Sequence, residues 1–210
     1  MRRKVEKLAD VLDASDFRWP KKGDRLFKGS QRWDGGVGFS DHPYARDAHI
    51  WDGCMTAASV LVERCRNNDV SRFDLVYPIL FNYRHGLEAA IKWVLDRYGR
   101  YTAIETYEKD HNLHKLWKVC RQVIEEVGGQ GGDDEALNAV EKIVHEFHSL
   151  DPESFSFRYS TKKNGKVVRL PDFAIDLEHL GDVMEGVNNF FTGVDGQLDG
   201  KSDVIHISLA

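Results

Sequence analysis

Three ionisable side chains recur every four residues within the apolar stretch FNYRHGLEAAIKWVL, residues 81–95. Arg84, Glu88 and Lys92 would stack along one margin of a helix, with His85 beside them. Charged groups that are bordered by apolar surface must be paired or must face a cleft. Two interpretations follow. Either Glu88 bridges Arg84 and Lys92 in a structural ion-pair ladder, or the row lines a functional groove between helices.

The histidine pair of HNLHKLW, His111 and His114, is the second chemical candidate. It lies just before or within the first turn of the next helix, and an antiparallel return would bring that helix back past the Arg84 helix. Histidine titrates near neutral pH, so a histidine close to Arg84 and Glu88 could act as a general acid or base. Arg84 or Lys92 could then hold a phosphate. Alternatively, both histidines cap the helix or lie on its surface.

Metal binding and cysteine chemistry are disfavoured. His145 and His148 form another HxxH pair that could bind a metal together with Glu88, but they lie away from the apolar face of their helix. No Glu-x-x-His pair repeats on two helices, and no glycine-rich phosphate loop follows a strand. The three cysteines fall at core positions and lack a CxxC pairing. We therefore predict no metal and no cofactor. The cysteines are Cys54, Cys65 and Cys120.

The elements that must position these residues are mostly helical. Apolar residues recur at helical spacing, and Ser, Asp, Asn and Gly mark the ends of the helices. Alternating Phe155, Phe157 and Tyr159 before an Asn-Gly turn predict one β-hairpin. The sequence thus predicts an all-α, up-and-down helical bundle with a small β-hairpin insertion near 155–169. The predicted helices span residues 3–14, 44–67, 72–98, 111–127, 133–151 and 176–192.

Composition divides the chain into three parts. Residues 1–43 form a basic, aromatic-rich N-terminal extension, residues 44–192 form the helical bundle domain, and residues 193–210 form a loose C-terminal tail. The aromatic residues of the extension could pack over the core or stack on bases. The apolar runs are too short for a membrane span and no signal sequence is evident, so we expect a cytoplasmic protein without membrane association.

Charge is distributed unevenly between these parts. Residues 1–32 contain ten Lys or Arg against five Asp or Glu, a net charge of +5. The whole chain carries −5, so residues 33–210 carry −10. An acidic body argues against a nonspecific duplex-binding face, because affinity for phosphates depends on clustered Lys and Arg. The basic extension could still contact a polyanion.

Two motifs carry a family resemblance. YPILFNYRHGLEAAIKWVL followed by HNLHKLW resembles the prokaryotic HEPN-like helical proteins, in which a helix often reading RHxLExxxK precedes an HxLxxLW-like helix. FSFRYSTKKNG, with Arg158 and Tyr159, is similar to the Phe-Arg-Tyr segment that accompanies these motifs in some chains. The resemblance spans residues 72–192. It implies an all-α bundle, often dimeric, in a superfamily linked to RNA binding, RNA cleavage and toxin–antitoxin or antiphage systems.

One departure from that superfamily concerns catalysis. Its catalytic members carry an Arg that is followed by a His after about four to six intervening residues, and the two meet at a composite dimer site for metal-independent RNA cleavage. No Arg in this sequence has a His at that interval, because Arg84 is followed at once by His85 and Arg46 already by His49. The resemblance therefore does not carry ribonuclease chemistry over to this chain.

Three functional hypotheses remain. The first is a binding or regulatory HEPN-like protein, expected to be a homodimer, that accepts RNA, a nucleotide or a protein partner encoded by a neighbouring gene. The second is a divergent metal-independent endoribonuclease in which a histidine acts as the base and Arg84 stabilises the phosphate. The third is a structural subunit of a larger complex. The first predicts the ligand-binding residues Arg84, Lys92, Arg158 and Tyr159; the second predicts the catalytic residues Arg84, His85, Glu88, His111 and His114.

Overall fold

The computed structural model describes residues 18–27, 29, 36–67, 71–104, 107, 110–129, 134–170 and 172–209, with side chains as far as residue 201. Within these ranges the protein contains five α-helices, one short 3-10 helix and no strand, which confirms the predicted all-α class. The chain forms two compact units, residues 1–39 and 40–210, whereas the sequence places that boundary at residue 43. The predicted helix over residues 3–14 lies outside the described residues.

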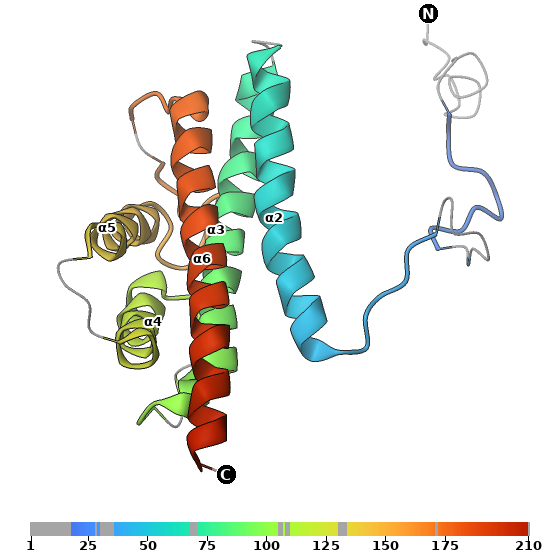
Figure 1. Ribbon diagram of the computed structural model, residues 1–210. Helices are drawn as coiled ribbons and strands as arrows, with labels where there is room; N and C mark the ends of the chain where they lie inside the picture. Colours follow the sequence, from blue (N-terminus) through green and yellow to red (C-terminus); the bar gives the residue numbers. More distant parts are fainter. Residues whose placement is uncertain are drawn as a thin grey trace, which may run out of the picture. The chain divides into compact units, whose positions relative to one another are not determined.

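The helices of the second unit lie in two groups (Figure 1). Three of them, α2 (Pro43–Arg66), α3 (Ser71–Tyr98) and α6 (Leu177–Leu209), run alongside one another. The other two, α4 (Leu113–Gly128) and α5 (Glu135–Leu150), form a helical hairpin that lies across this group, with α4 contacting both α3 and α6. The crossing hairpin differs from the predicted up-and-down arrangement, in which all the axes would be aligned.

Apolar rows at helical spacing explain the packing of these helices. The predicted row on α2 is buried at Trp51, Met55, Ala58, Val62 and Cys65. Gly86 brings α3 close to this row, because a Cβ at that position would lie 3.2 Å from the Met55 side chain. None of the described helices is both long enough and apolar enough to cross a membrane.

Side-chain caps fix the starts of three helices. The side-chain oxygen of Asn112 accepts a hydrogen bond from the Lys115 amide at the start of α4, and Asp134 accepts one from the Leu137 amide at the start of α5. Asp176 accepts hydrogen bonds from two backbone amides in the first turn of α6, each at 3.0 Å. These oxygens satisfy amides that have no partner within the helix. The expectation that Asp marks the ends of helices is met at Asp134 and Asp176.

The predicted loose tail differs from the structure, because residues 193–201 continue α6. Its Gly- and Asp-rich composition suggested a mobile segment, yet Val194 and Leu198 are buried in the core. The carboxylate of Asp195 accepts a hydrogen bond from the Trp93 indole at 2.7 Å, and the carboxylate of Asp199 pairs with Arg97 at 2.5 Å. Contacts with α3 therefore hold this stretch in the helix.

The predicted β-hairpin near 155–169 is not formed by strands. The segment contains a single antiparallel bridge, between Thr161 and Val167, around a turn in which Gly165 has a φ of 77°. The alternating aromatic residues lie in an irregular segment that contains turns, because the carboxylate of Asp151 accepts hydrogen bonds from the Phe155 and Ser156 amides at 2.7 and 2.8 Å. These hydrogen bonds curl the chain where the alternation suggested an extended strand.

Candidate functional site

Arg84 lies at the centre of a buried ionic network. Its side chain is 1% exposed, and each of its three guanidinium nitrogens has an oxygen partner within the protein. Nη1 donates to the Glu88 carboxylate at 2.6 Å, and Nη2 donates to the His111 carbonyl, also at 2.6 Å. Nε donates to the Asp151 carbonyl at 3.3 Å and lies 3.5 Å from the Asp151 carboxylate. The guanidinium therefore joins α3 to two segments that are distant in sequence.

Glu88 is the anionic centre of the same network and is 2% exposed. Its Oε2 accepts from Arg84, while its Oε1 lies 2.7 Å from the ammonium of Lys92 and 2.8 Å from Nδ1 of His111. Burial opposes ionisation of this carboxyl group, but its hydrogen bonds with Lys92, Arg84 and His111 outweigh that effect and lower its pKa from 4.5 to about 2. Glu88 is therefore ionised at neutral pH, as a buried and fully paired carboxylate can be.

These contacts correspond to the structural ladder rather than to an open groove along α3. Arg84, Glu88, Lys92 and His111 come together as the sequence suggested, but a phosphate could reach the Arg84 guanidinium only by displacing acceptors that already satisfy it. His111 remains accessible, since its side chain is 65% exposed. The catalytic role of these residues stays a prediction.

His114 belongs to a different cluster, between α4 and α5. Its ring lies 4.5 Å from that of His145 and 6.0 Å from that of His148, measured between centroids. The Nδ1 atom of His148 is buried without a hydrogen-bond partner, and burial, reinforced by nearby positive charge, lowers the pKa of that histidine. Among the residues described, no group of three His, Cys, Asp or Glu side chains is arranged to hold a metal ion.

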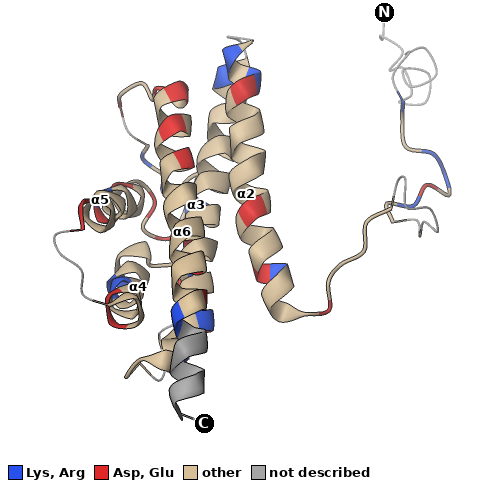
Figure 2. Ribbon diagram, viewed as in Figure 1, with Lys and Arg blue, Asp and Glu red and all other residues tan. Residues whose placement is uncertain are grey.

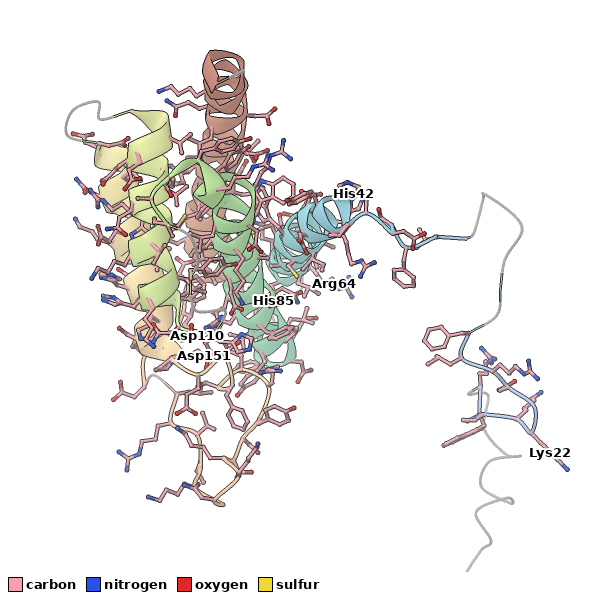
Figure 3. All side chains as sticks on the ribbon, turned by 90° about the horizontal axis from the view of Figure 1, so that it is seen from below. Lys22, His42, Arg64, His85, Asp110 and Asp151 are labelled. Carbon is pink, nitrogen blue, oxygen red and sulfur yellow. The ribbon has the colours of Figure 1, made fainter. Side chains whose placement is uncertain are left out.

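His85, which is labelled in Figure 3, follows Arg84 on α3 and begins a column of stacked groups. Its ring stacks on Phe81, with centroids 5.8 Å apart and planes 3° from parallel. The Arg158 guanidinium carbon lies 5.7 Å from the Phe81 ring centre and 5.6 Å from that of Tyr159. Tyr159 in turn stacks on Phe155 at 4.6 Å. We call these five residues, His85, Phe81, Arg158, Tyr159 and Phe155, the Arg158 surface.

The Arg158 surface is accessible and has basic and aromatic neighbours. Tyr159 is 53% exposed, and Arg158 is exposed as well. The rings of Tyr77 and Phe73, which lie one and two helical turns before Phe81 on α3, are also exposed. The chain beyond Tyr159 adds four exposed cations. Among the residues that the structure describes, Lys162 is the only one of the four with an ion-pair partner, Glu153 at 3.4 Å. The four cations are Lys162, Lys163, Lys166 and Arg169.

His85 is the imidazole of the Arg158 surface. Partial burial lowers its pKa, and the nearby positive charges of Arg84, Lys92 and His111 act in the same direction, while the carboxylate of Glu88 opposes them. At neutral pH His85 is consequently an uncharged aromatic ring.

The buried network positions the Arg158 surface through Asp151. Arg84 holds Asp151 from α3, and the Asp151 carboxylate binds the Phe155 and Ser156 amides. Two hydrogen bonds from Arg158 close the next turn. Its amide donates to the Phe155 carbonyl at 3.1 Å, and its guanidinium donates to the Ser154 carbonyl. A buried anchor therefore supports an exposed cation that lies close to two aromatic rings.

The family resemblance singled out Arg158 and Tyr159, whereas their supports Asp151, Phe81 and Phe155 were not predicted. The spacing of Phe81 and His85, four residues apart on one helix, was a usable signal for their stacking. No comparable local signal exists for Asp151, which lies 67 residues from Arg84 in the sequence.

Comparison with known proteins gives no match to a family model, to a curated protein or to a solved structure.

Proposed function

We propose that this protein binds single-stranded RNA or a nucleotide through the Arg158 surface. The observation that carries the proposal is the exposed Arg158 guanidinium close to the Phe81 and Tyr159 rings, 5.7 and 5.6 Å from their centres. Proteins that bind single strands combine cations for the phosphates with aromatic rings on which bases stack. Both kinds of group are present here side by side.

The local charge supports an RNA or nucleotide ligand. Residues 156–170 carry five Lys or Arg and no Asp or Glu, although the chain as a whole has a net charge of −5. A cationic segment of this size on an acidic protein suits a short stretch of backbone, whereas a long duplex would also meet the acidic remainder. The unpaired bases of a single strand can reach the exposed face of Tyr159.

Binding is favoured over cleavage by the state of the predicted catalytic residues. Arg84 and Glu88 are buried and satisfied by each other, by Lys92 and by the His111 segment. A divergent endoribonuclease would need Arg84 to face the reacting phosphate. In our proposal Arg84 instead acts as a positioning residue for the Arg158 surface.

The proposal includes the HEPN-like class, a cytoplasmic homodimer and a regulatory role in a toxin–antitoxin or antiphage system, all of which rest on the resemblance of the RHxLE and HxLxxLW motifs. In the alternative function, the protein is a structural subunit of a larger complex, and the Arg158 surface contacts another protein.

The test is fluorescence anisotropy with a fluorescein-labelled single-stranded RNA of twelve nucleotides. We expect saturable binding that Arg158→Ala and Tyr159→Ala each weaken by about tenfold, because loss of one stacked base contact costs about 1–3 kcal/mol. Arg64→Ala is the matched control, since Arg64 is an exposed arginine of α2. Equal losses for Arg64→Ala and Arg158→Ala, or no binding by the wild type, would reject the proposal. RNA that stays intact on a gel, with and without EDTA, would separate binding from cleavage.

A further inference from the structure

A groove of about 340 Å³ lies between α2 and α6 and shares no residue with the Arg158 surface. Its apolar part is formed by Met55, Val62 and Met184, and α3 contributes Tyr83. The helices approach closely at Gly181, where a Cβ would lie 3.2 Å from the side chain of Val62. This volume is at the lower end of the range for sites that bind small molecules.

Tyr83 presents its hydroxyl group to this groove. Its side chain is only 3% exposed, and its hydroxyl oxygen lies 3.8 Å from where a Cβ of Gly181 would be. No hydrogen bond joins this hydroxyl to any part of the chain that the structure describes. Burial raises the pKa of Tyr83, and the carboxylates of Glu185 and Asp182 add to that effect against the opposing charge of Arg66, so the hydroxyl is neutral at pH 7. Because the hydroxyl faces the groove, it can accept a hydrogen bond from a bound ligand.

The carboxylates around the groove determine which charge a ligand of the groove would carry. Glu178, Asp182 and Glu185 form an acidic row along the N-terminal part of α6, which Figure 2 shows in red. Asp182 and Glu185 line the groove, and Glu63 of α2 lies at the opposite wall. The only cation in the lining, Arg66, already pairs with Glu63 at 3.0 Å and lies 3.7 Å from Asp182. In the described structure Glu185 has no ion-pair partner, so the groove is net negative and repels anions.

We propose that this groove binds an aliphatic polyamine. One ammonium group would lie between the Glu185 carboxylate and the Tyr83 hydroxyl, both of which can accept its hydrogen bonds. The methylene chain would cover Met55 and Met184, and a second ammonium group would reach the carboxylates of Glu63 or Asp182. A ligand with charged groups separated by methylenes matches carboxylates separated by apolar side chains. The site is independent of RNA binding.

Isothermal titration calorimetry of the full chain, freed of nucleic acid, with spermidine as the probe tests this assignment. We expect one saturable site, which Glu185→Gln and Tyr83→Phe each weaken at least tenfold. Tyr83→Phe removes only the hydroxyl and keeps the ring, so the thermal melting temperature should stay close to that of the wild type. The matched control is Glu126→Gln, because Glu126 is an exposed carboxylate on α4 outside the groove. That variant should bind spermidine as the wild type does.

Three results would overturn the assignment: no saturable binding, an equal loss for Glu126→Gln and Glu185→Gln, or unchanged affinity in Tyr83→Phe. 1-Butylamine, which carries a single ammonium group, should bind at least tenfold more weakly than spermidine; equal affinity would also contradict a polyamine site. Arg158→Ala should bind spermidine normally even where it has lost RNA, so failure of one proposal is distinguishable from failure of the other.

Discussion

The guanidinium of Arg84 donates a hydrogen bond from Nε to the backbone carbonyl of Asp151, which lies 67 residues further along the chain, at 3.3 Å. This contact ties the central helix α3 to the start of the segment that carries Arg158 and Tyr159. It links a buried charge to an exposed surface, so the stability of the fold and the geometry of the proposed binding site depend on the same side chain.

Replacing Arg84 should strongly destabilise the protein. Arg84→Ala leaves the buried carboxylates of Glu88 and Asp151 without their shared partner, and breaking a buried ion pair costs about 3–5 kcal/mol. We expect a loss of this size in the free energy of unfolding, measured by urea denaturation with circular dichroism. Arg64→Ala, on the exposed side of α2, should change the same quantity by less than about 0.5 kcal/mol. Similar effects of the two substitutions would show that the network is not a determinant of stability.

Glu88 should make stability depend on pH in the acid range. Its pKa is lowered from 4.5 to about 2 in the folded protein, so the unfolded chain binds the proton more readily. The stabilising contribution, roughly 3 kcal/mol at most, is fully present above pH 4.5 and is lost as the pH falls towards 2. Urea unfolding at pH 7, 5, 4 and 3 should show that the difference between wild type and Glu88→Gln shrinks with falling pH. A difference that stays constant over this range would contradict the assignment.

Asp151 should control the order of the Arg158 surface. Asp151→Ala removes the acceptor for the Phe155 and Ser156 amides, and each lost hydrogen bond is worth about 1 kcal/mol. Hydrogen exchange at these two amides should accelerate about tenfold, and RNA affinity should fall although Arg158 is intact. Glu153→Ala, which removes an exposed carboxylate of the same segment, is the control. If the Asp151 variant retains both protection and affinity, the segment is positioned by other contacts.

Leu198 tests the C-terminal part of α6. This side chain is fully buried, and a Cβ at Gly128 of α4 would lie 3.6 Å from it. Leu198→Ala should lower the free energy of unfolding by about 2–5 kcal/mol through the cavity that it creates. Gln197→Ala, one residue away on the exposed side of the helix, should have little effect. A neutral Leu198→Ala would instead fit the loose tail that the composition of this segment suggests.

Local patterns were sufficient to predict much of this fold. The spacing of apolar residues located the five described α-helices, although α6 only as far as residue 192. Asp side chains cap the starts of α5 and α6, and such caps are predictable because a cap depends on residues only two or three positions away. The pairing of Arg84 with Glu88, and of Glu88 with Lys92, was likewise predictable from their spacing along one helix.

Contacts between distant segments could not be predicted in this way. The carbonyls of His111 and Asp151 accept hydrogen bonds from Arg84 only after the chain has folded back, and their residue types give no sign of it. The alternating aromatic residues suggested a strand. The hydrogen bonds that the Phe155 and Ser156 amides donate to Asp151 bend this segment, and the alternation of residue types gives no sign of them. The crossing of the α4–α5 hairpin over the other helices was not predictable either, because an apolar row specifies which face of a helix is buried but not the crossing angle.

Consecutive placement of Arg84 and His85 has a consequence for how the sequence can diverge. Neighbouring helical residues point about 100° apart, so one faces the buried network and the other the Arg158 surface. Insertion or deletion of one residue in this turn of α3 would rotate the residues on one side of it by about 100° and disrupt both features. The exposed turn around Asn164 and Gly165 carries no such constraint. Changes in length and charge there would alter the surface proposed to bind RNA while the helices stay the same.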